Sequence, residues 1–252
     1  QPFIIQYFQW VGKIFTGNMG YSYIKNQEVF PMFMQALPNT LLLTLSSIVT
    51  TILISIPLGI WSAVKQNKIT DYVIRVCTFI GNAMPNFFIA LLLIYVFALQ
   101  LHWFPVMGNN GFISIILPTL TLALAMSAKY TRQVRATVLD ELNKDYVIGA
   151  RARGIKERTI VLAHVLKSSM LTIVTLLGLS LGSLLGGTAI VESIFMWPGV
   201  GKLAVDAISS RDYQVIQVYV IWMAIIYVAI NLITDIVYHY LDPRIRIQGE
   251  EG

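Results

Sequence analysis

The chain carries few side chains suited to covalent or metal chemistry, and those it has are scattered. Its 252 residues include one Cys and three His. His102, His164 and His239 fall in three separate segments, so they are not expected to converge on a metal ion. Cys77 lies in an apolar run and is interpreted as a small apolar helix residue rather than a reactive thiol. A disulfide framework is excluded, and no Ser/His/Asp or Cys/His arrangement can be assembled.

Phosphate chemistry is equally absent from the sequence. A nucleotide-binding phosphate loop has Gly, four residues and then Gly-Lys-Ser/Thr, and no segment matches it. Gly199-Val200-Gly201-Lys202 resembles it superficially but has the wrong spacing. The chain is therefore predicted to hydrolyse no ATP and to hold no cofactor or metal of its own.

Small residues inside an apolar segment indicate another role, the passage of a polar solute. Gly178, Gly182 and Gly186 share one helix face because they are four residues apart, and Ser183 lies among them. Such a face permits close helix packing or leaves room for a substrate, and both interpretations remain open.

A second polar cluster surrounds a proline. Asn82, Pro85 and Asn86 interrupt another apolar run. A proline flanked by two amides opens a helix and offers hydrogen bonds inside a membrane, which predicts a hinge or a lining of the solute path. Polar residues of the first predicted span are weaker candidates for lining the solute path, because Ser and Thr hydroxyls often bond back to their own helix. These residues are Asn39, Thr44, Ser47 and Thr51.

These residues need elements that hold them inside a membrane. Hydrophobic residues make up 56% of the chain, charged residues make up 12%, and the mean hydropathy is +0.68. A soluble domain carries about 25% charged residues, so an ordinary cytoplasmic enzyme, a disordered protein and a DNA-binding module are excluded. The expected fold class is all-α, a polytopic membrane helical bundle.

Five segments are long enough to cross a bilayer, which takes about 20 apolar residues. The predicted spans are residues 37–64, 72–99, 112–130, 168–190 and 215–240. Pro57, Pro85 and Pro118 lie within them and are tolerated where neighbouring helices satisfy the freed carbonyls. Residues 1–36 form an N-terminal segment and residues 37–252 the transmembrane domain.

The basic residues set the orientation. If residues 1–36 lie outside, only Lys13, Lys25, Lys202 and Arg211 of the 18 Lys and Arg residues are extracytoplasmic. This positive-inside bias places the C-terminus in the cytoplasm. It also accounts for the net charge of +5 better than nucleic-acid binding does.

An outside N-terminal segment must be carried across the membrane. Residues 1–36 have an amphipathic stretch from Phe3 to Phe15, but they have neither a 20-residue apolar run nor a signal-peptide pattern. We therefore expect a further transmembrane helix upstream.

The inner connection, residues 131–167, has a recognisable local pattern. Asn143 or Asp145 is expected to cap a short helix, and Gly154 stands where a left-handed residue ends it. A second helix opens near Lys156 and leads into the fourth span. This predicts a rigid knob that projects into the cytoplasm.

The small and charged residues of the knob favour docking to a partner over a merely solvated loop. Small side chains let a partner's backbone approach, and charges set orientation and register. The predicted docking residues are Asp145, Tyr146, Gly149, Ala150, Arg151, Ala152, Arg153, Gly154, Lys156 and Glu157.

The order of several motifs resembles the permease subunits of bacterial binding-protein-dependent ABC importers, most closely the branch for oligopeptides, dipeptides and nickel complexes. The resemblance covers nearly the whole chain. The motifs are Gln6-Tyr7-Phe8, Gly17-Asn18-Met19-Gly20-Tyr21-Ser22, Asp145-Tyr146, Gly149-Ala150-Arg151-Ala152-Arg153-Gly154, His164-Val165-Leu166-Lys167, Glu192-Ser193-Ile194-Phe195-Met196-Trp197-Pro198-Gly199-Val200-Gly201, Arg211-Asp212-Tyr213 and Asp242-Pro243-Arg244-Ile245-Arg246.

In the wider family the inner loop reads Glu-Ala-Ala, three residues and Gly, and it inserts into a groove on an ATPase subunit. This chain has Ile148 and Gly149 where Glu and the first Ala stand, and His164 and Lys167 where Ile and Pro stand. The peptide and nickel branch commonly departs in this way. The resemblance therefore implies that the knob docks on an ATPase, without a salt bridge from the missing Glu.

The outer connection, residues 191–214, is the expected outer gate or dock for a solute-binding protein. Pro and Gly break its helix, while Trp and Tyr suit a membrane interface. Its candidate residues are Glu192, Trp197, Pro198, Gly199, Gly201, Arg211 and Asp212.

The resemblance implies a transport subunit of the bacterial cytoplasmic membrane rather than an enzyme. Its expected partners are a second, similar permease in a heterodimer, two ATPase subunits that bind ATP and Mg, and an extracytoplasmic solute-binding protein. A permease for nickel or another metal chelate is an open alternative to a peptide permease.

A secondary transporter driven by an ion gradient is a more distant alternative. It would place ionisable residues at the midplane, where these spans have almost none. Asp235, near the inner end of the last span, is interpreted as an interfacial anchor.

Overall fold

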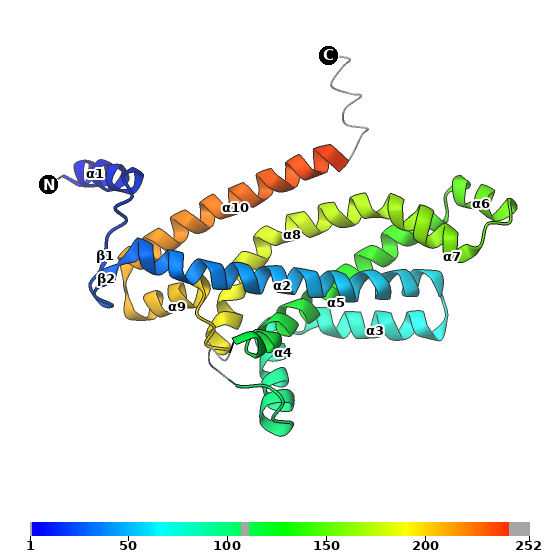
Figure 1. Cartoon of the computed structure of the whole chain (residues 1–252), viewed down its shortest axis with the longest axis horizontal. Helices are drawn as coiled ribbons and strands as arrows, with labels where there is room; N and C mark the ends of the chain where they lie inside the picture. The colour runs from blue at the N-terminus through cyan, green and yellow to red at the C-terminus, as the bar shows by residue number, and fades with distance from the viewer. Residues whose placement is uncertain (1, 107–110, 242–252) are drawn as a thin grey trace, which may run out of the picture.

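Long helices dominate the computed structural model (Figure 1), as the apolar composition predicts. The structure describes residues 2–106 and 111–241, without the side chains of Phe15, of most of residues 171–187 and of residues 237–241. The α-helices are α1 (Phe3–Phe15), α2 (Val29–Val64), α3 (Ile69–Ala83), α4 (Asn86–Leu93), α5 (Ile116–Leu142), α6 (Asp145–Ala152), α7 (Glu157–Thr159), α8 (Leu166–Ile194), α9 (Val200–Ser210) and α10 (Tyr213–Leu241). The other elements are the π-helices η1 (Ile94–Gln100) and η3 (Ile160–Val165), the 3₁₀ turn η2 (Gly111–Ile113) and the antiparallel strands β1 (Tyr21–Ser22) and β2 (Gln27–Glu28).

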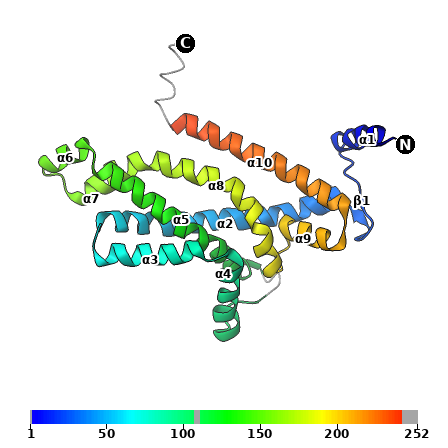
Figure 2. The ribbon, with the colours of Figure 1, turned by 180° about the vertical axis from the view of Figure 1, so that it is seen from behind.

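The long helices lie side by side along the longest axis of the molecule (Figures 1 and 2). α5 is central, because α2, α3 and α8 all pack against it. The β1–β2 hairpin, α1 and α9 lie at one end of the bundle, and α6 and α7 lie at the other end. The predicted inner and outer connections therefore occupy opposite ends, as a membrane-spanning bundle requires.

Three stretches among the described residues are long and apolar enough to cross a membrane: α2, η2 with α5, and Tyr213–Ile236 of α10. The pair α3 and α4–η1 is a fourth if it forms one broken span. α8 is helical throughout the predicted fourth span, although most of its side chains lie outside the described part. The polytopic helical bundle is confirmed, and the number of five spans stays a prediction.

The predicted second span is not a continuous helix. Its two halves, α3 and α4–η1, meet at an angle of 105°. Pro85 lacks a backbone N–H and its ring disfavours a helical residue before it, so Met84 is extended, with ψ of 130°. The break confirms the prediction that Pro85 opens the helix, whereas Pro57 lies inside α2 and Pro118 lies in the first turn of α5.

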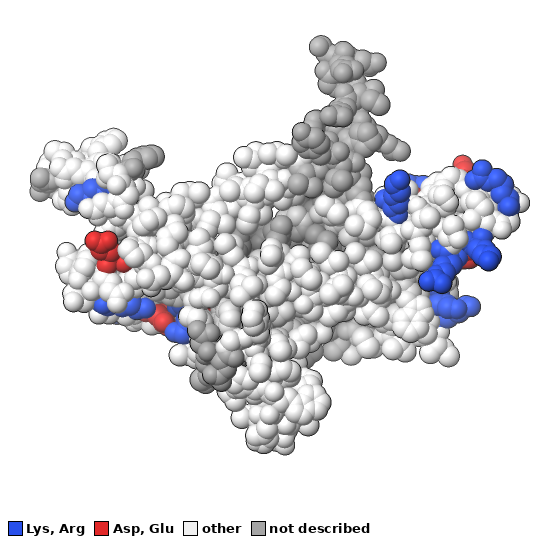
Figure 3. Space-filling model, viewed as in Figure 1, with Lys and Arg blue, Asp and Glu red and all other residues white. Residues whose placement is uncertain are grey.

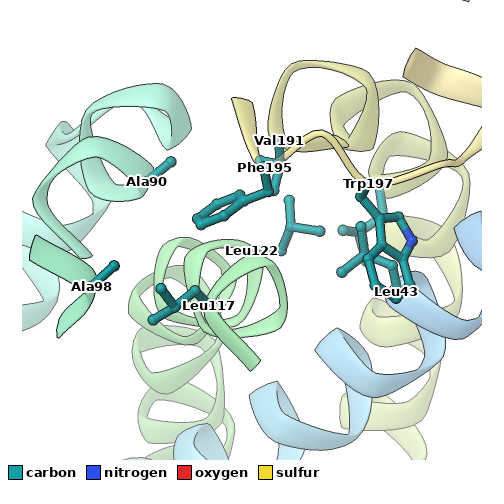
Figure 4. Packing of buried hydrophobic residues seen from close by; sticks show 9 residues of the cluster. Leu43, Ala90, Ala98, Leu117, Leu122, Val191, Phe195 and Trp197 are labelled. Carbon is teal, nitrogen blue, oxygen red and sulfur yellow. The ribbon is translucent and has the colours of Figure 1, made fainter. Parts of the chain in front are cut away.

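Three clusters of buried apolar side chains lie along the bundle. The middle cluster surrounds Leu122 of α5, with Phe195 and Val191 on one side and Trp197 and Leu43 on the other (Figure 4). The other two clusters hold the ends. The end with α9 has Val29, Phe33, Val200, Leu203 and Val215, and the end with α6 has Val134, Val138, Val147, Ala150 and Ile160.

A buried ion pair fixes the turn between α2 and α3 to α5. Asp71 is fully buried, and its carboxylate accepts hydrogen bonds from Nε and Nη2 of Arg135, each at 2.8 Å. It also accepts hydrogen bonds from the Ser62 hydroxyl and from the Asn67 backbone N–H. Asn67 adopts φ of 61°, a left-handed turn conformation that Asn tolerates. This ion pair joins residues far apart in the chain, and the sequence pattern did not predict it.

We expect Asp71→Asn to destabilise the bundle by about 3–5 kcal/mol, because it leaves the Arg135 guanidinium without its buried partner. Arg132→Gln is the matched control, since Arg132 is an exposed residue of the same helix, and its effect should stay within about 0.5 kcal/mol. Thermal unfolding of the detergent-solubilised protein measures both variants. Equal melting temperatures for the two would contradict a structural role for the pair.

Candidate functional site

The knob is a helix, a glycine turn and a return helix, as the sequence predicts. α6 ends at Ala152, and Gly154, just beyond its C-cap residue Arg153, has φ of +76°. There the Gly154 N–H donates to the Arg151 carbonyl and the Ile155 N–H donates to the Ala150 carbonyl, which satisfies carbonyls that the helix end leaves open. Lys144 occupies the N-cap position, so the expectation that Asn143 or Asp145 caps the helix is wrong.

The knob is fastened to the bundle by its apolar side. Val147 and Ala150 are buried against Val134 and Val138 of α5 and Ile160 of η3. The opposite side of α6 is exposed and includes Tyr146, Ile148, Gly149, Arg151 and Ala152. The structure thus places the predicted docking residues on the surface, with Ala150 as the buried exception.

Ion pairs brace the knob internally. Arg151 donates to both carboxylate oxygens of Glu157, at 3.1 Å from Nε and 2.6 Å from Nη2. This contact lowers the pKa of Glu157, so the pair is fully formed at neutral pH and weakens as the pH falls below the ordinary Glu value. Each side chain is about half exposed, which limits the contribution to stability.

Glu141, at the end of α5, anchors the start of the knob. It accepts hydrogen bonds from Lys144 and from the Tyr146 hydroxyl, the latter at 2.9 Å. Burial and this hydrogen bond raise the pKa of Tyr146. Glu141 was not among the predicted docking residues, although its i,i+3 spacing to Lys144 is a local signal for such a pair.

Basic side chains gather around the knob end of the molecule (Figure 3). The knob carries Arg151, Arg153, Lys156 and Arg158, and the α2–α3 turn adds Lys65 and Lys68. The charge asymmetry used to orient the chain is therefore a property of one end of the folded bundle.

The break at Pro85 borders a cavity of about 250 Å³ between α3, α4, α5 and α8. Asn82 and Asn86 both line it, together with Leu122 and Lys129 of α5 and Leu184 of α8. We call it the elbow cavity. Two of the three residues predicted around the proline thus share one hollow, while Pro85 itself is the N-cap of α4.

Of the predicted glycine face, Gly178 lies against α10. A Cβ at this position would stand 2.2 Å from Cγ2 of Thr234, so Gly178 permits close packing of α8 on α10. Gly182, Ser183 and Gly186 lie outside the side chains that the structure describes.

The hydroxyls of α2 mostly bond to their own helix. Thr44, Ser47 and Thr51 donate to the carbonyls four residues earlier, which agrees with their weaker candidacy. The Asn39 side-chain amide instead donates to the Pro198 carbonyl at 2.9 Å, and the Asn39 backbone carbonyl accepts from the Trp197 indole at 3.0 Å. It therefore holds the outer connection.

Glu192 organises the outer connection. Its side chain is fully buried, accepts the Thr40 hydroxyl of α2 at 2.7 Å and accepts the Lys202 backbone N–H of α9 at 2.9 Å. A carboxylate at this position complements the positive end of α9. We call this arrangement the outer lock.

Gly199 and Gly201 are required by the outer lock. A Cβ on Gly199 would stand 2.4 Å from the Glu192 carboxylate and 2.5 Å from the Thr40 hydroxyl, and one on Gly201 would stand 2.5 Å from Cα of Ala189. Packing therefore explains the two glycines of the motif from Glu192 to Gly201, because the loop that carries them passes close to a buried carboxylate.

Asp212 ties the N-terminal hairpin to the same end. It is buried and accepts the Ser22 hydroxyl at 2.5 Å. Arg211 precedes it with φ of 57°, which turns the chain from α9 into α10. Two of the motifs that carry the resemblance, at Ser22 and at Asp212, thus meet in space.

No group of three His, Cys, Asp or Glu that could hold a metal ion occurs among residues 2–106 and 111–241. Cys77 is exposed at the surface of α3. The terminal motif from Asp242 to Arg246 and the side chain of His239 lie outside the described residues.

Comparison with known proteins identifies relatives over nearly the whole chain. Residues 55–247 match the family described as "Binding-protein-dependent transport system inner membrane component". The oligopeptide transport system permease protein AppB of Bacillus subtilis (strain 168) is 42% identical over 97% of this chain and 81% of its own length. The glutathione transport system permease protein GsiC of Escherichia coli (strain K12) is 36% identical over 98% and 80%.

Solved structures confirm the fold. An inward-facing form of the MetNI methionine ABC transporter superimposes with a TM-score of 0.69 over 84% of this chain and 96% of that chain, at 16% identity. An amino acid ABC transporter crystallised with histidines gives a TM-score of 0.59 over 85% and 94%, at 19% identity.

The outer lock predicts that Gly199→Ala is destabilising, because the added methyl must displace the Glu192 carboxylate or the Thr40 hydroxyl. Overpacking of this kind costs about 1–3 kcal/mol. Gly12→Ala is the control, since nothing lies within 4 Å of its added Cβ. Thermal unfolding in detergent compares the two, and a Gly199→Ala protein as stable as the control would refute the lock.

Proposed function

We propose that this chain, which belongs to the family of binding-protein-dependent transport system inner membrane components, forms half of the translocation path of an ATP-driven oligopeptide importer. Family membership makes it a membrane-embedded permease subunit of an ABC importer in the peptide branch, a transport subunit rather than an enzyme. Its relatives are named for oligopeptide and glutathione transport, and the nickel alternative has no support among them.

The knob is the observation that supports coupling to separate ATPases. It presents exposed small and charged residues on one side, and its other side is packed into the apolar cluster of α5 and η3. A push on the exposed side is therefore transmitted to two long helices without an intervening flexible segment. ATP and Mg bind to the partner ATPase subunits in this proposal.

The exposed apolar helices support pairing with a second permease. Only 6% of the most apolar window of α10 is buried within the chain, and Val228, Leu232 and Ile233 are at least 59% exposed. Lipid covers part of such a surface, and a similar, non-identical permease covers the rest and closes the path in a heterodimer.

The end that carries α9 faces the extracytoplasmic solute-binding protein in this proposal, and the C-terminus lies in the cytoplasm. The outer lock and the Ser22–Asp212 contact make this end a rigid dock. Closure of the ATPases around ATP then rocks the helices between inward-open and outward-open states, and the solute passes between the two permeases.

The knob turn provides the test of coupling. Gly154→Val places a β-branched residue at φ of +76°, which costs about 1–2 kcal/mol and shifts α6. Peptide uptake by proteoliposomes of the full complex should fall about tenfold, while ATP hydrolysis by the complex continues.

The matched control is Gly154→Asn, because Asn tolerates left-handed backbone and should keep most of the uptake. Normal ATP-dependent uptake by Gly154→Val would refute the docking role.

A further inference from the structure

The elbow cavity has a polar lining that the proposed coupling role does not use. One face of α5 contributes residues at positions i, i+3, i+4, i+7 and i+8, the spacing of a helix stripe. These residues are Leu122, Ala125, Met126, Lys129 and Tyr130. The break between α3 and α4 contributes Asn82 and Asn86, so one lysine and two asparagines are among the residues that line one hollow of about 250 Å³.

Lys129 is the charged residue of this α5 face. It lies at the inner end of the predicted span 112–130 and is exposed in the isolated chain, and a charge at this depth is retained where a water-filled cavity or a partner receives it. The ion pairs found among the described residues do not include Lys129. The sequence indicates only that Lys129 is a basic residue of the inner side, because the packing of the helices decides which side chains line the cavity.

We propose that the elbow cavity is a transient site for the carboxylate of the transported peptide, held by Lys129, with Asn82 and Asn86 bonding to the adjacent peptide main chain. This inference rests on the proposed peptide-import function. An ammonium attracts a carboxylate, and a carboxamide both donates to and accepts from a peptide group.

The chemistry suits a path that takes peptides of varied sequence. A carboxylate and a main-chain amide occur in every peptide, so these contacts do not depend on side chains. The volume is below the range of about 300–1,000 Å³ for sites that enclose a drug-sized ligand. The cavity therefore accommodates one end of a peptide and leaves selection to the solute-binding protein.

A charge-selective thiol reaction tests the site without relying on the receptor. Asn82→Cys, in a Cys77→Ser background of the full complex in nanodiscs, is treated with an anionic sulfonate methanethiosulfonate and a cationic trimethylammonium one. We compare the rate at which the anionic reagent modifies the cysteine with the rate for the cationic reagent. Adding Lys129→Gln should lower this ratio at least threefold, because one unit charge at about 6 Å in water changes a rate by about that factor.

Two further variants serve as matched controls for that reaction. Lys129→Arg should keep the ratio, because it keeps the charge. Lys68→Gln should also keep it, because Lys68 lies in the α2–α3 turn. An unchanged ratio in Lys129→Gln would mean that the ammonium extends away from the cavity, and absence of labelling would mean that the cavity excludes solutes; either result overturns the inference.

Peptide uptake separates this inference from the proposed function. In proteoliposomes with receptor and ATPases, Lys129→Gln should import a tripeptide about tenfold more slowly, the loss expected for a hydrogen bond to a charged group. Lys129→Arg and Lys68→Gln should stay within about twofold of wild type. Equal uptake by Lys129→Gln would overturn the inference alone, whereas failure of the wild type to import any peptide would overturn the proposed function.

Discussion

Two buried carboxylates hold α2, and the placement of the other helices depends on them. Thr40 of α2 donates to Glu192, and Ser62 of α2 donates to Asp71. A carboxylate removed from water is costly unless several donors surround it, so each of these carboxylates needs its donors in place. Because Glu192 also caps α9 and Asp71 also binds Arg135 of α5, α2 is the element to which both ends are fixed.

α5 connects the regions assigned to transport. Near one end it shares an apolar cluster with the knob through Val134 and Val138. Farther along, the same helix lines the elbow cavity and contributes Leu122 to the middle cluster (Figure 4). In the proposed mechanism, a displacement of the knob would reach the cavity through one continuous helix. The break at Pro85 lets α4 run in a different direction from α3.

Local signals in the sequence were sufficient for the knob and the proline break. Gly154 marks a left-handed helix end and Pro85 removes a backbone donor, and both effects act within a few residues. The carboxylate contacts join residues far apart along the chain, such as Thr40 with Glu192, and depend on which helices become neighbours. Lys129 shows the same limit, because its charge was evident but the cavity it lines exists only after α3, α5 and α8 have packed.

The distance along α2 between Thr40 and Ser62, the two residues that bond to the buried carboxylates, is close to the thickness of a bilayer. Thr40 and Ser62 are separated by about 33 Å of helix at about 1.5 Å per residue, which is close to the about 30 Å thickness of a bilayer's hydrocarbon interior. In a bilayer of that thickness with α2 upright, both acidic groups would lie near the levels of the lipid headgroups, where dehydration is least severe. A thinner or thicker bilayer would pull one of them out of register with its headgroup layer, so lipid chain length becomes a variable that acts on this permease through hydrogen bonds at its two surfaces.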